Sequence, residues 1–107
     1  MSEVDIRAFA AAHADGALVI DVREPHEYVS GHVPGARLIP VGDVPLRSAD
    51  LPRNERVLVV CESGNRSRSV VGRLRADGVD ALSLSGGTAA WRAAGRPLVV
   101  GPRANRG

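Results

Sequence analysis

The chain has 107 residues, of which 44% are hydrophobic and 24% are charged, and its formal net charge at pH 7 is +2. This length and composition are typical of one soluble globular domain. There is a single cysteine, which excludes an internal disulfide and a zinc site built from several thiolates. We expect one domain over residues 1–100 and a flexible C-terminal tail over residues 101–107.

The basic residues are all arginines, and this limits the reactions and partners to be considered. Without lysine, the chain cannot form a Schiff base or use a lysine nucleophile. The arginines are spread along the chain, and few aromatic residues lie between them, unlike the pattern of single-strand nucleic-acid binding. No stretch approaches the ~20 apolar residues that cross a bilayer, and the acidic start does not resemble a signal peptide. We therefore expect a cytoplasmic protein that binds neither nucleic acid nor a membrane.

The sequence of the first half of the chain predicts helices that alternate with buried strands. Ser2 and Asp5 resemble a capping arrangement, and the apolar stripe behind them predicts a helix that runs to about His13. The apolar run 17–22 is typical of a strand buried on both faces. Three shorter elements follow: a helix from Pro25 to Tyr28 or Ser30, a turn over residues 31–36, and a strand over residues 37–40.

The second half begins with residues 41–56, where glycine and proline break regular structure and one helical turn is expected within residues 44–49. The clearest strand, 56–60, ends directly before Cys61. Three further elements are expected: a helix over residues 67–77 that ends at Gly78, a strand over residues 79–84, and a helix over about residues 88–94. Strands that alternate with helices predict a parallel sheet covered on both faces.

Cys61 begins the loop 61–67, which joins the clearest strand to the following helix. In an open α/β sheet, ligands bind beyond the carboxyl ends of the strands. The first N–H groups of a helix are unpaired and carry partial positive charge, so a loop over this end can cradle an anion. Gly64 keeps the loop compact, and Arg66 adds a permanent positive charge. We expect this field to favour the nucleophilic thiolate of Cys61 and to hold a persulfide anion.

Plainer interpretations of the same residues stay open. A lone cysteine is commonly a small buried hydrophobic residue, and Arg66 is also compatible with a place on the surface. The residues after Cys61 are polar, however, and do not make an apolar burial site. This polarity favours a reactive cysteine.

Outside the loop, the remaining candidates have structural explanations. His32 lies in a turn, where we expect its imidazole to bond to the backbone rather than to act as a general base. Asp21 and Arg23 follow a strand end, and we expect them to join loops by ion pairing. Trp91 is expected in the core, and the glycine pair 86–87 predicts a tight strand-to-helix turn because it lacks the pattern of a phosphate loop.

Four segments, in order and at natural spacing, resemble the rhodanese family. They are Asp21-Val22-Arg23-Glu24, the stretch 27–36 with Gly31-His32-Val33-Pro34-Gly35-Ala36, the loop Cys61-Glu62-Ser63-Gly64-Asn65-Arg66-Ser67, and Leu84-Ser85-Gly86-Gly87 followed by Trp91. The resemblance covers nearly the whole chain. It implies an α/β fold with three α/β/α layers and a central, mainly parallel five-stranded sheet.

The resemblance also implies a sulfurtransferase without a metal or another cofactor. Cys61 would be the catalytic residue, which takes sulfur from thiosulfate or a thiol persulfide and passes it to cyanide or a thiol. The substrate-binding residues would be those of the active loop: Glu62, Ser63, Gly64, Asn65, Arg66 and Ser67. Because Cys61 is the only cysteine, the donor and the acceptor must be other molecules, with a sulfur-accepting protein as a further candidate.

Glu62 departs from the uncharged or basic residue that the family often has after the cysteine. A carboxylate at the rim is expected to repel thiosulfate, which favours a small thiol persulfide or a protein persulfide as the donor. The alternative is that Glu62 points away and pairs with Arg66 or Arg68.

Two other functions are compatible with parts of the same pattern. A cysteine-dependent phosphatase or arsenate reductase has a similar loop, but with five residues between cysteine and arginine; here there are four, from Glu62 to Asn65. A smaller ring suits a sulfur atom better than a tetrahedral phosphate. The second alternative is a non-catalytic persulfide carrier, which a partner protein would load and which would not turn over small substrates.

Overall fold

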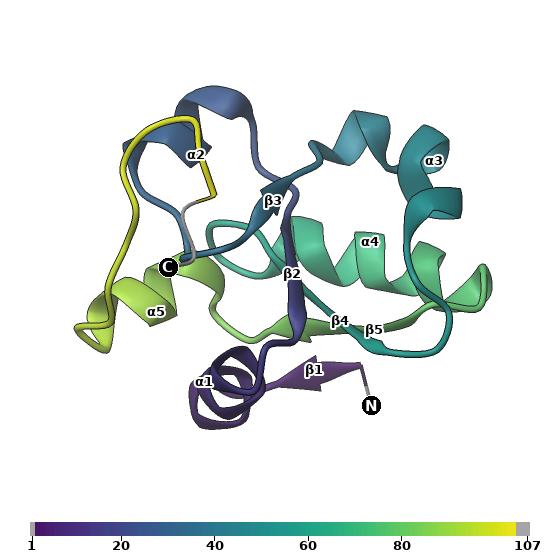
Figure 1. Cartoon of the computed structure of the whole chain (residues 1–107), viewed down its shortest axis with the longest axis horizontal. Coiled ribbons are helices and arrows are strands. Elements are labelled where there is room, and N and C mark those ends of the chain that lie inside the picture. Colours follow the sequence, from purple (N-terminus) through teal and green to yellow (C-terminus); the bar gives the residue numbers. More distant parts are fainter. Residues whose placement is uncertain (1, 105–107) are drawn as a thin grey trace.

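A computed structural model of the chain, described over residues 2–104, contains one sheet with helices on both faces (Figure 1). The strands are β1 (Glu3–Val4), β2 (Leu18–Asp21), β3 (Arg37–Leu38), β4 (Arg56–Val60) and β5 (Asp80–Leu84). The helices are α1 (Ile6–Ala14), α2 (Pro25–Ser30), α3 (Val44–Arg47), α4 (Asn65–Ala76) and α5 (Gly87–Ala93).

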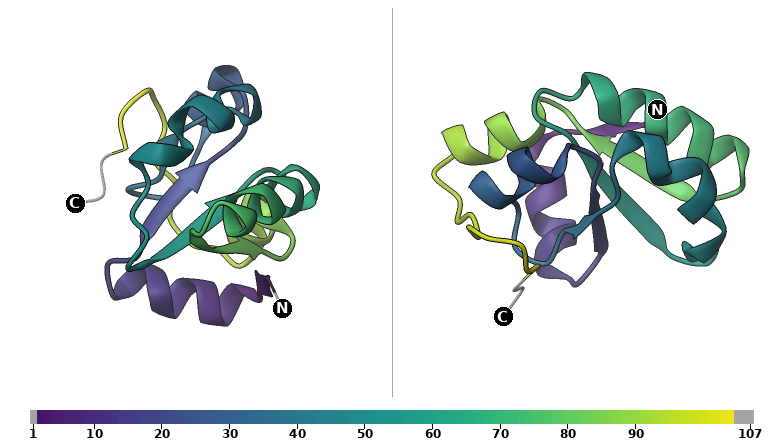
Figure 2. Two further views of the ribbon diagram at one scale, coloured as in Figure 1. Left: turned by 90° about the vertical axis from the view of Figure 1, so that its right-hand side faces the viewer. Right: turned by 90° about the horizontal axis from the view of Figure 1, so that it is seen from above.

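The strand order is β1-β5-β4-β2-β3, and each neighbouring pair is parallel. The five-stranded sheet of the described residues therefore confirms the predicted fold class. Because alternate strand residues point to opposite faces, the sheet divides the apolar core into two layers. One layer contains Ile20, Val57 and Val59 with the inner faces of α3 and α4, and the other contains Val19 and Leu58 with α1, α2 and α5. Figure 2 shows α1 and α4 on opposite sides of the sheet.

The start of the chain differs from the prediction. Residues Glu3–Val4 form the edge strand β1, and the helix begins only at Ile6. Its N-cap is Asp5, whose side chain accepts a hydrogen bond of 2.8 Å from the backbone N–H of Ala8. Ser2 instead accepts from the backbone of Ser83 on β5 through its carbonyl oxygen, at 2.8 Å. A two-residue strand is too short to show an alternating pattern, so its residues were assigned to the apolar stripe of the following helix.

The other elements follow the predicted order. Within residues 41–56, α3 lies between two short 3₁₀ turns, Val41–Asp43 and Ser48–Asp50. Helix α4 begins at Asn65, two residues before the predicted start, because Gly64 turns the chain with a φ of 102°. A positive φ of this kind favours glycine.

The segment after α5 returns along α2 and the turn that follows it. Val99 pairs with His32 in an antiparallel bridge, and the N–H of Gly101 donates to Val29 at 2.8 Å. The carbonyl of Ala104 accepts from Gly35 at 2.9 Å. The end of the predicted tail, residues 105–107, lies outside the described part of the chain. Across residues 2–104, none of the helices is both long and apolar enough to pass through a bilayer.

Candidate active site

Cys61 lies immediately after β4, at the carboxyl edge of the sheet. The same edge carries the end of β2 with Asp21 and Arg23, and the turn between β5 and α5. The chain after Cys61 turns at Gly64 and continues as α4. The cysteine is therefore held between the end of a central strand and the start of a helix, as the sequence predicted.

Several hydrogen-bond donors surround the sulfur of Cys61, although the residue is only 1% exposed. The backbone N–H groups of Gly64 and Ser67 donate to Sγ at 3.0 and 3.4 Å, and the hydroxyl oxygen of Ser67 lies 3.5 Å from it. Burial raises the pKa of the thiol, but hydrogen bonds from Ser67, Gly64 and the backbone of Ser63 outweigh this effect. The pKa of Cys61 is therefore below its ordinary value, which favours the nucleophilic thiolate.

The first residues of α5 pack against the backbone of the loop after β4. The N–H of Thr88 donates to the carbonyl of Cys61 at 2.8 Å, and the N–H of Ala89 donates to that of Glu62 at 3.0 Å. A Cβ at Gly87 would lie 2.6 Å from the carbonyl oxygen of Cys61 and 2.7 Å from that of Glu62. Only glycine allows this approach, and the pair Gly86-Gly87 is thus the tight strand-to-helix turn that was predicted.

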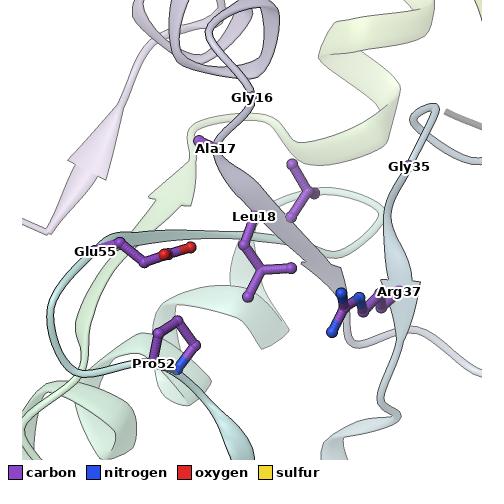
Figure 3. A pocket seen from close by; sticks show the side chains of 8 residues that line it. Gly16, Ala17, Leu18, Gly35, Arg37, Pro52 and Glu55 are labelled. Atoms are coloured by element: carbon purple, nitrogen blue, oxygen red, sulfur yellow. The ribbon is translucent and has the colours of Figure 1, made fainter. Parts of the chain in front are cut away.

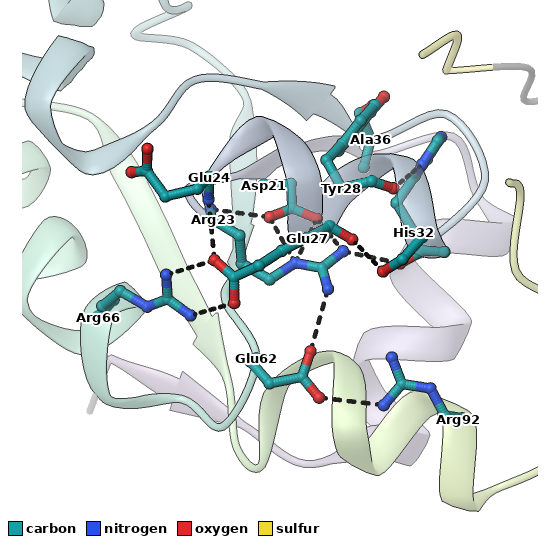
Figure 4. A network of polar contacts seen from close by, with 12 residues as sticks. Asp21, Arg23, Glu24, Glu27, Tyr28, His32, Ala36, Glu62, Arg66 and Arg92 are labelled. Atoms are coloured by element: carbon teal, nitrogen blue, oxygen red, sulfur yellow. Dashed lines mark hydrogen bonds and ion pairs between the residues drawn. The ribbon is translucent and has the colours of Figure 1, made fainter. Parts of the chain in front are cut away.

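Glu62 is held by arginines from two other elements, and not by Arg66 or Arg68 (Figure 4). Its carboxylate accepts hydrogen bonds of 3.0 Å from Arg23 after β2 and of 3.0 Å from Arg92 on α5. Arg23 is itself buried and bound to Asp21 at 2.9 Å. The alternative pairing of Glu62 with Arg66 or Arg68 is therefore not what the structure shows, because its carboxylate is bound by Arg23 and Arg92 instead.

Arg66 is bound by Glu27 of α2 through two hydrogen bonds of 2.7 and 2.9 Å (Figure 4). Glu27 also accepts from the backbone N–H of Glu24 and so closes a capping box at the start of α2. The hydrogen bonds from Arg66 lower the pKa of Glu27 to about 2. A donor anion would therefore have to share Arg66 with this carboxylate, and the substrate-binding role of Arg66 stays a prediction.

The other loop residues differ in burial and in their hydrogen-bond partners. Gly64 and Ser67 are buried with Cys61, whereas Ser63 and Asn65 are exposed. The side-chain oxygen of Asn65 accepts from Arg68 at 2.6 Å. Ser63 contributes its backbone N–H to the thiol. Whether any of these residues binds a substrate stays a prediction.

The chain is similar to known proteins over most of its length. The family described as the rhodanese-like domain matches residues 6–94. The chain belongs to the rhodanese-like domain family. It is 32% identical over 103 residues to a protein of Allochromatium vinosum named sulfurtransferase, and the match covers 94% of this chain and 96% of that one. It is also 40% identical over 82 residues to the thiosulfate sulfurtransferase GlpE of Pseudomonas putida, with 74% and 73% covered.

A solved structure shows the same architecture. The crystal structure of a rhodanese-related protein from Thermoplasma volcanium matches with a TM-score of 0.87 at 27% identity, over 92% of this chain and 98% of that chain. This rhodanese-like domain thus resembles relatives named sulfurtransferase in sequence and a solved rhodanese-related protein in fold.

His32 has the structural role that its turn predicted. The imidazole is 0% exposed and stacks on the ring of Tyr28, with 3.7 Å between ring centroids. Its ring nitrogens lie 2.8 Å from the carbonyl oxygens of Tyr28 and Arg103. Both nitrogens are therefore engaged by the backbone, which leaves no free nitrogen to act as a base on Cys61.

Three residues near the site of this rhodanese-like domain were not singled out from the sequence. They are Glu27, Ser83 and Arg92, which contact Arg66, Ser67 and Glu62 respectively. Glu27 and Arg66 are 39 residues apart, and no spacing rule connects them. A signal did exist for Ser83, because a serine is unusual in the apolar alternation of a buried strand.

A hollow on the surface lies at the opposite edge of the sheet (Figure 3). It is lined by Leu18 at the start of β2, Arg37 at the start of β3 and Glu55 just before β4. Amino and carboxyl ends of parallel strands lie at opposite edges, so this hollow is separate from the Cys61 site.

Proposed function

We propose that this chain is a sulfurtransferase in which Cys61 carries the transferred sulfur as a persulfide. The observation that supports it best is the convergence of the N–H groups of Gly64 and Ser67 on Sγ, at 3.0 and 3.4 Å. These donors stabilise a sulfur anion before any substrate arrives. The family membership points to the same reaction class.

The reaction balances in two steps without a base or a cofactor. The Cys61 thiolate attacks the outer sulfur of the donor, and the bond between the two donor sulfurs breaks. Sulfite leaves with the electron pair if the donor is thiosulfate, and a thiolate leaves if it is a thiol persulfide. Cyanide or an acceptor thiolate then attacks the outer sulfur of the persulfide and releases the Cys61 thiolate.

The charges at the rim bear on the choice of donor. Glu62 was expected to repel thiosulfate, but its carboxylate is compensated by Arg23 and Arg92. Glu27 in turn compensates Arg66. A dianion such as thiosulfate is therefore not strongly repelled at this rim. The three arginines named here, however, are each already paired with a carboxylate. We propose a thiol persulfide, small or on a partner protein, as the better donor and thiosulfate as a slower one.

Intact-mass spectrometry tests the function directly. Incubation with thiosulfate or a small thiol persulfide should add the mass of one sulfur atom, and cyanide should remove it. Cys61→Ser, which keeps a hydroxyl in place of the thiol, should gain no mass. Multiple turnovers with a small donor and cyanide are expected for an enzyme.

Two outcomes would contradict the proposal. If the wild-type chain gains no sulfur from either donor, Cys61 is not a sulfur nucleophile under these conditions. If it is loaded once but does not turn over, it is a persulfide carrier rather than a catalyst.

A further inference from the structure

Ser83 is a buried hydroxyl on the face of β5 that packs against α4. It is 0% exposed and lies beside Val59 in the register of β4 and β5. Val59 and Ala81 on the same face belong to an otherwise apolar cluster. Burying a hydroxyl in such surroundings costs free energy unless it is hydrogen-bonded. Its side-chain partner is the hydroxyl of Ser67, with 2.6 Å between the two oxygens.

The hydroxyl of Ser67 stands between Ser83 and the reactive sulfur. Its oxygen lies 2.6 Å from Oγ of Ser83, 3.2 Å from the carbonyl oxygen of Gly64 and 3.5 Å from Sγ of Cys61. A serine hydroxyl has one proton to donate and two lone pairs to accept. Ser67 can therefore donate to only one of these three neighbours at a time.

The protonation of Cys61 decides which arrangement is better. With a neutral thiol, the S–H donates to Ser67, and Ser67 donates to Gly64 or Ser83. With a thiolate, the proton of Ser67 is needed at the sulfur, and a lone pair of Ser67 is free to accept from Ser83. A hydroxyl that accepts a hydrogen bond is also a stronger donor, because bonds in a chain polarise one another.

We propose that Ser83 is a positioning residue that turns the Ser67 hydroxyl toward Cys61 and so stabilises its thiolate. No proton moves along the chain of hydroxyls; only the two O–H bonds rotate, and the thiol proton leaves to solvent. The consequence for catalysis rests on the proposed function. The titration of the Cys61 thiol is independent of the proposed function, because it needs no sulfur donor.

Charged groups around the loop are the other influence on the titration of Cys61. They are Asp21 and Arg23 after β2, Glu27 on α2, Glu62 in the loop, Arg66 on α4 and Arg92 on α5. All six are engaged in the ion pairs described above. A change at Ser83 leaves these groups in place, so a difference in titration reports the hydroxyl.

The test is a pH titration of the thiolate by its ultraviolet absorbance in the full chain. Below the wild-type midpoint, Ser83→Ala should contain about two- to fivefold less thiolate, as expected for the loss of one neutral hydrogen bond. Ser67→Ala should lose at least as much. The double variant should match Ser67→Ala alone, because Ser83 acts only through Ser67. Ser85→Ala, at an exposed position beyond the same strand, should titrate like the wild type.

Two results would overturn the proposal: a Ser83→Ala titration equal to that of the wild type, or additive effects of Ser67→Ala and Ser83→Ala. If Ser83→Ala does not fold, the pair Ser83→Thr and Ser83→Val replaces it, since both add the same bulk and only threonine keeps the hydroxyl. The threonine variant must then retain more thiolate than the valine variant. If the variants titrate as predicted but the wild type gains no sulfur from a donor, the proposed function is contradicted and the role of Ser83 is not.

Discussion

Glu62 shows how a charged residue next to Cys61 can leave the charge of the site nearly unchanged. Its carboxylate accepts from Arg23, which is buried, and from Arg92, which is half exposed, at 3.0 Å each. Opposite charges at such distances compensate one another for a ligand that approaches from solvent. The electrostatics of the rim therefore depend on pairs of residues.

Replacing Glu62 by Gln is expected to lower the KM for thiosulfate. The change leaves one guanidinium charge uncompensated, which should lower KM about two- to fivefold at low ionic strength and less in high salt. Steady-state kinetics over a series of salt concentrations measure this. Glu55→Gln makes the same change in net charge at the opposite edge of the sheet and is the matched control. A KM that stays constant or rises in Glu62→Gln would contradict the compensation.

Glu27 should couple the stability of the domain to acid pH. Its pKa is lowered to about 2 in the folded chain from 4.5, chiefly by hydrogen bonds from Arg66. A lowered carboxyl pKa stabilises the fold above the unfolded value, and this contribution is lost as pH falls through the folded value. Glu27→Gln should therefore lower the melting temperature at pH 7.

The difference in melting temperature between the wild type and Glu27→Gln should shrink between pH 4.5 and about pH 2. Thermal unfolding followed by circular dichroism at several pH values measures it. Because both partners are partly exposed, we expect a small effect, reduced further by salt. A difference that does not change with pH would show that packing, rather than charge, is what Glu27 contributes.

At the scale of elements, the site depends on how closely the first residue of α5, Gly87, approaches the loop after β4. Gly87 combines a φ of 60° with a space in which a Cβ would lie 2.6 Å from the carbonyl oxygen of Cys61. Gly95 has a similar φ of 74°, but nothing lies within 4 Å of its would-be Cβ. The two glycines therefore separate the cost of backbone strain from that of the steric conflict.

Gly87→Ala is expected to destabilise the fold by about 2–3 kcal/mol and Gly95→Ala by about 1 kcal/mol, since strain is common to both and overpacking affects only the first. Urea unfolding measures the two values. Sulfur loading per folded molecule should fall in Gly87→Ala, because the displaced carbonyls of Cys61 and Glu62 move the loop, and should stay normal in Gly95→Ala. Equal effects of the two changes would show that the close approach is unimportant.

Elements with strong local patterns could be predicted, and those defined by distant partners could not. Strand β4 is a continuous apolar run after Arg56, and α4 has an apolar stripe with Gly64 just before it and Gly78 just after it. The edge strand β1 has only two residues, and it is a strand because it pairs with β5, about 80 residues later in the chain. Local sequence contains no trace of that pairing, so a helix was expected there.

For the whole molecule, the loop around Cys61 and the charged rim differ in the same way: the loop is local in sequence, and the rim is not. Cys61 and the loop that donates to it are contiguous in sequence, and their arrangement follows from a strand, a glycine turn and a helix start. The residues that pair with Glu62 and Arg66 at the rim come from the segment after β2, from α2 and from α5, and only the folded sheet brings them together. The sequence nevertheless predicted that Asp21 and Arg23 join loops by ion pairing, and Arg23 does connect the end of β2, through Asp21, to Glu62 in the loop after β4.

The recessed position of Cys61 bears on how the chain withstands oxidants. At 1% exposure its sulfur is poorly placed to form a disulfide with a second copy of the chain, and it has no internal cysteine partner. Oxidation to a sulfenic acid would thus not be stopped by a disulfide and could continue to the irreversible sulfinic acid. An attached outer sulfur would take that damage in place of Sγ, and reduction of the sulfur–sulfur bond would then restore the thiol.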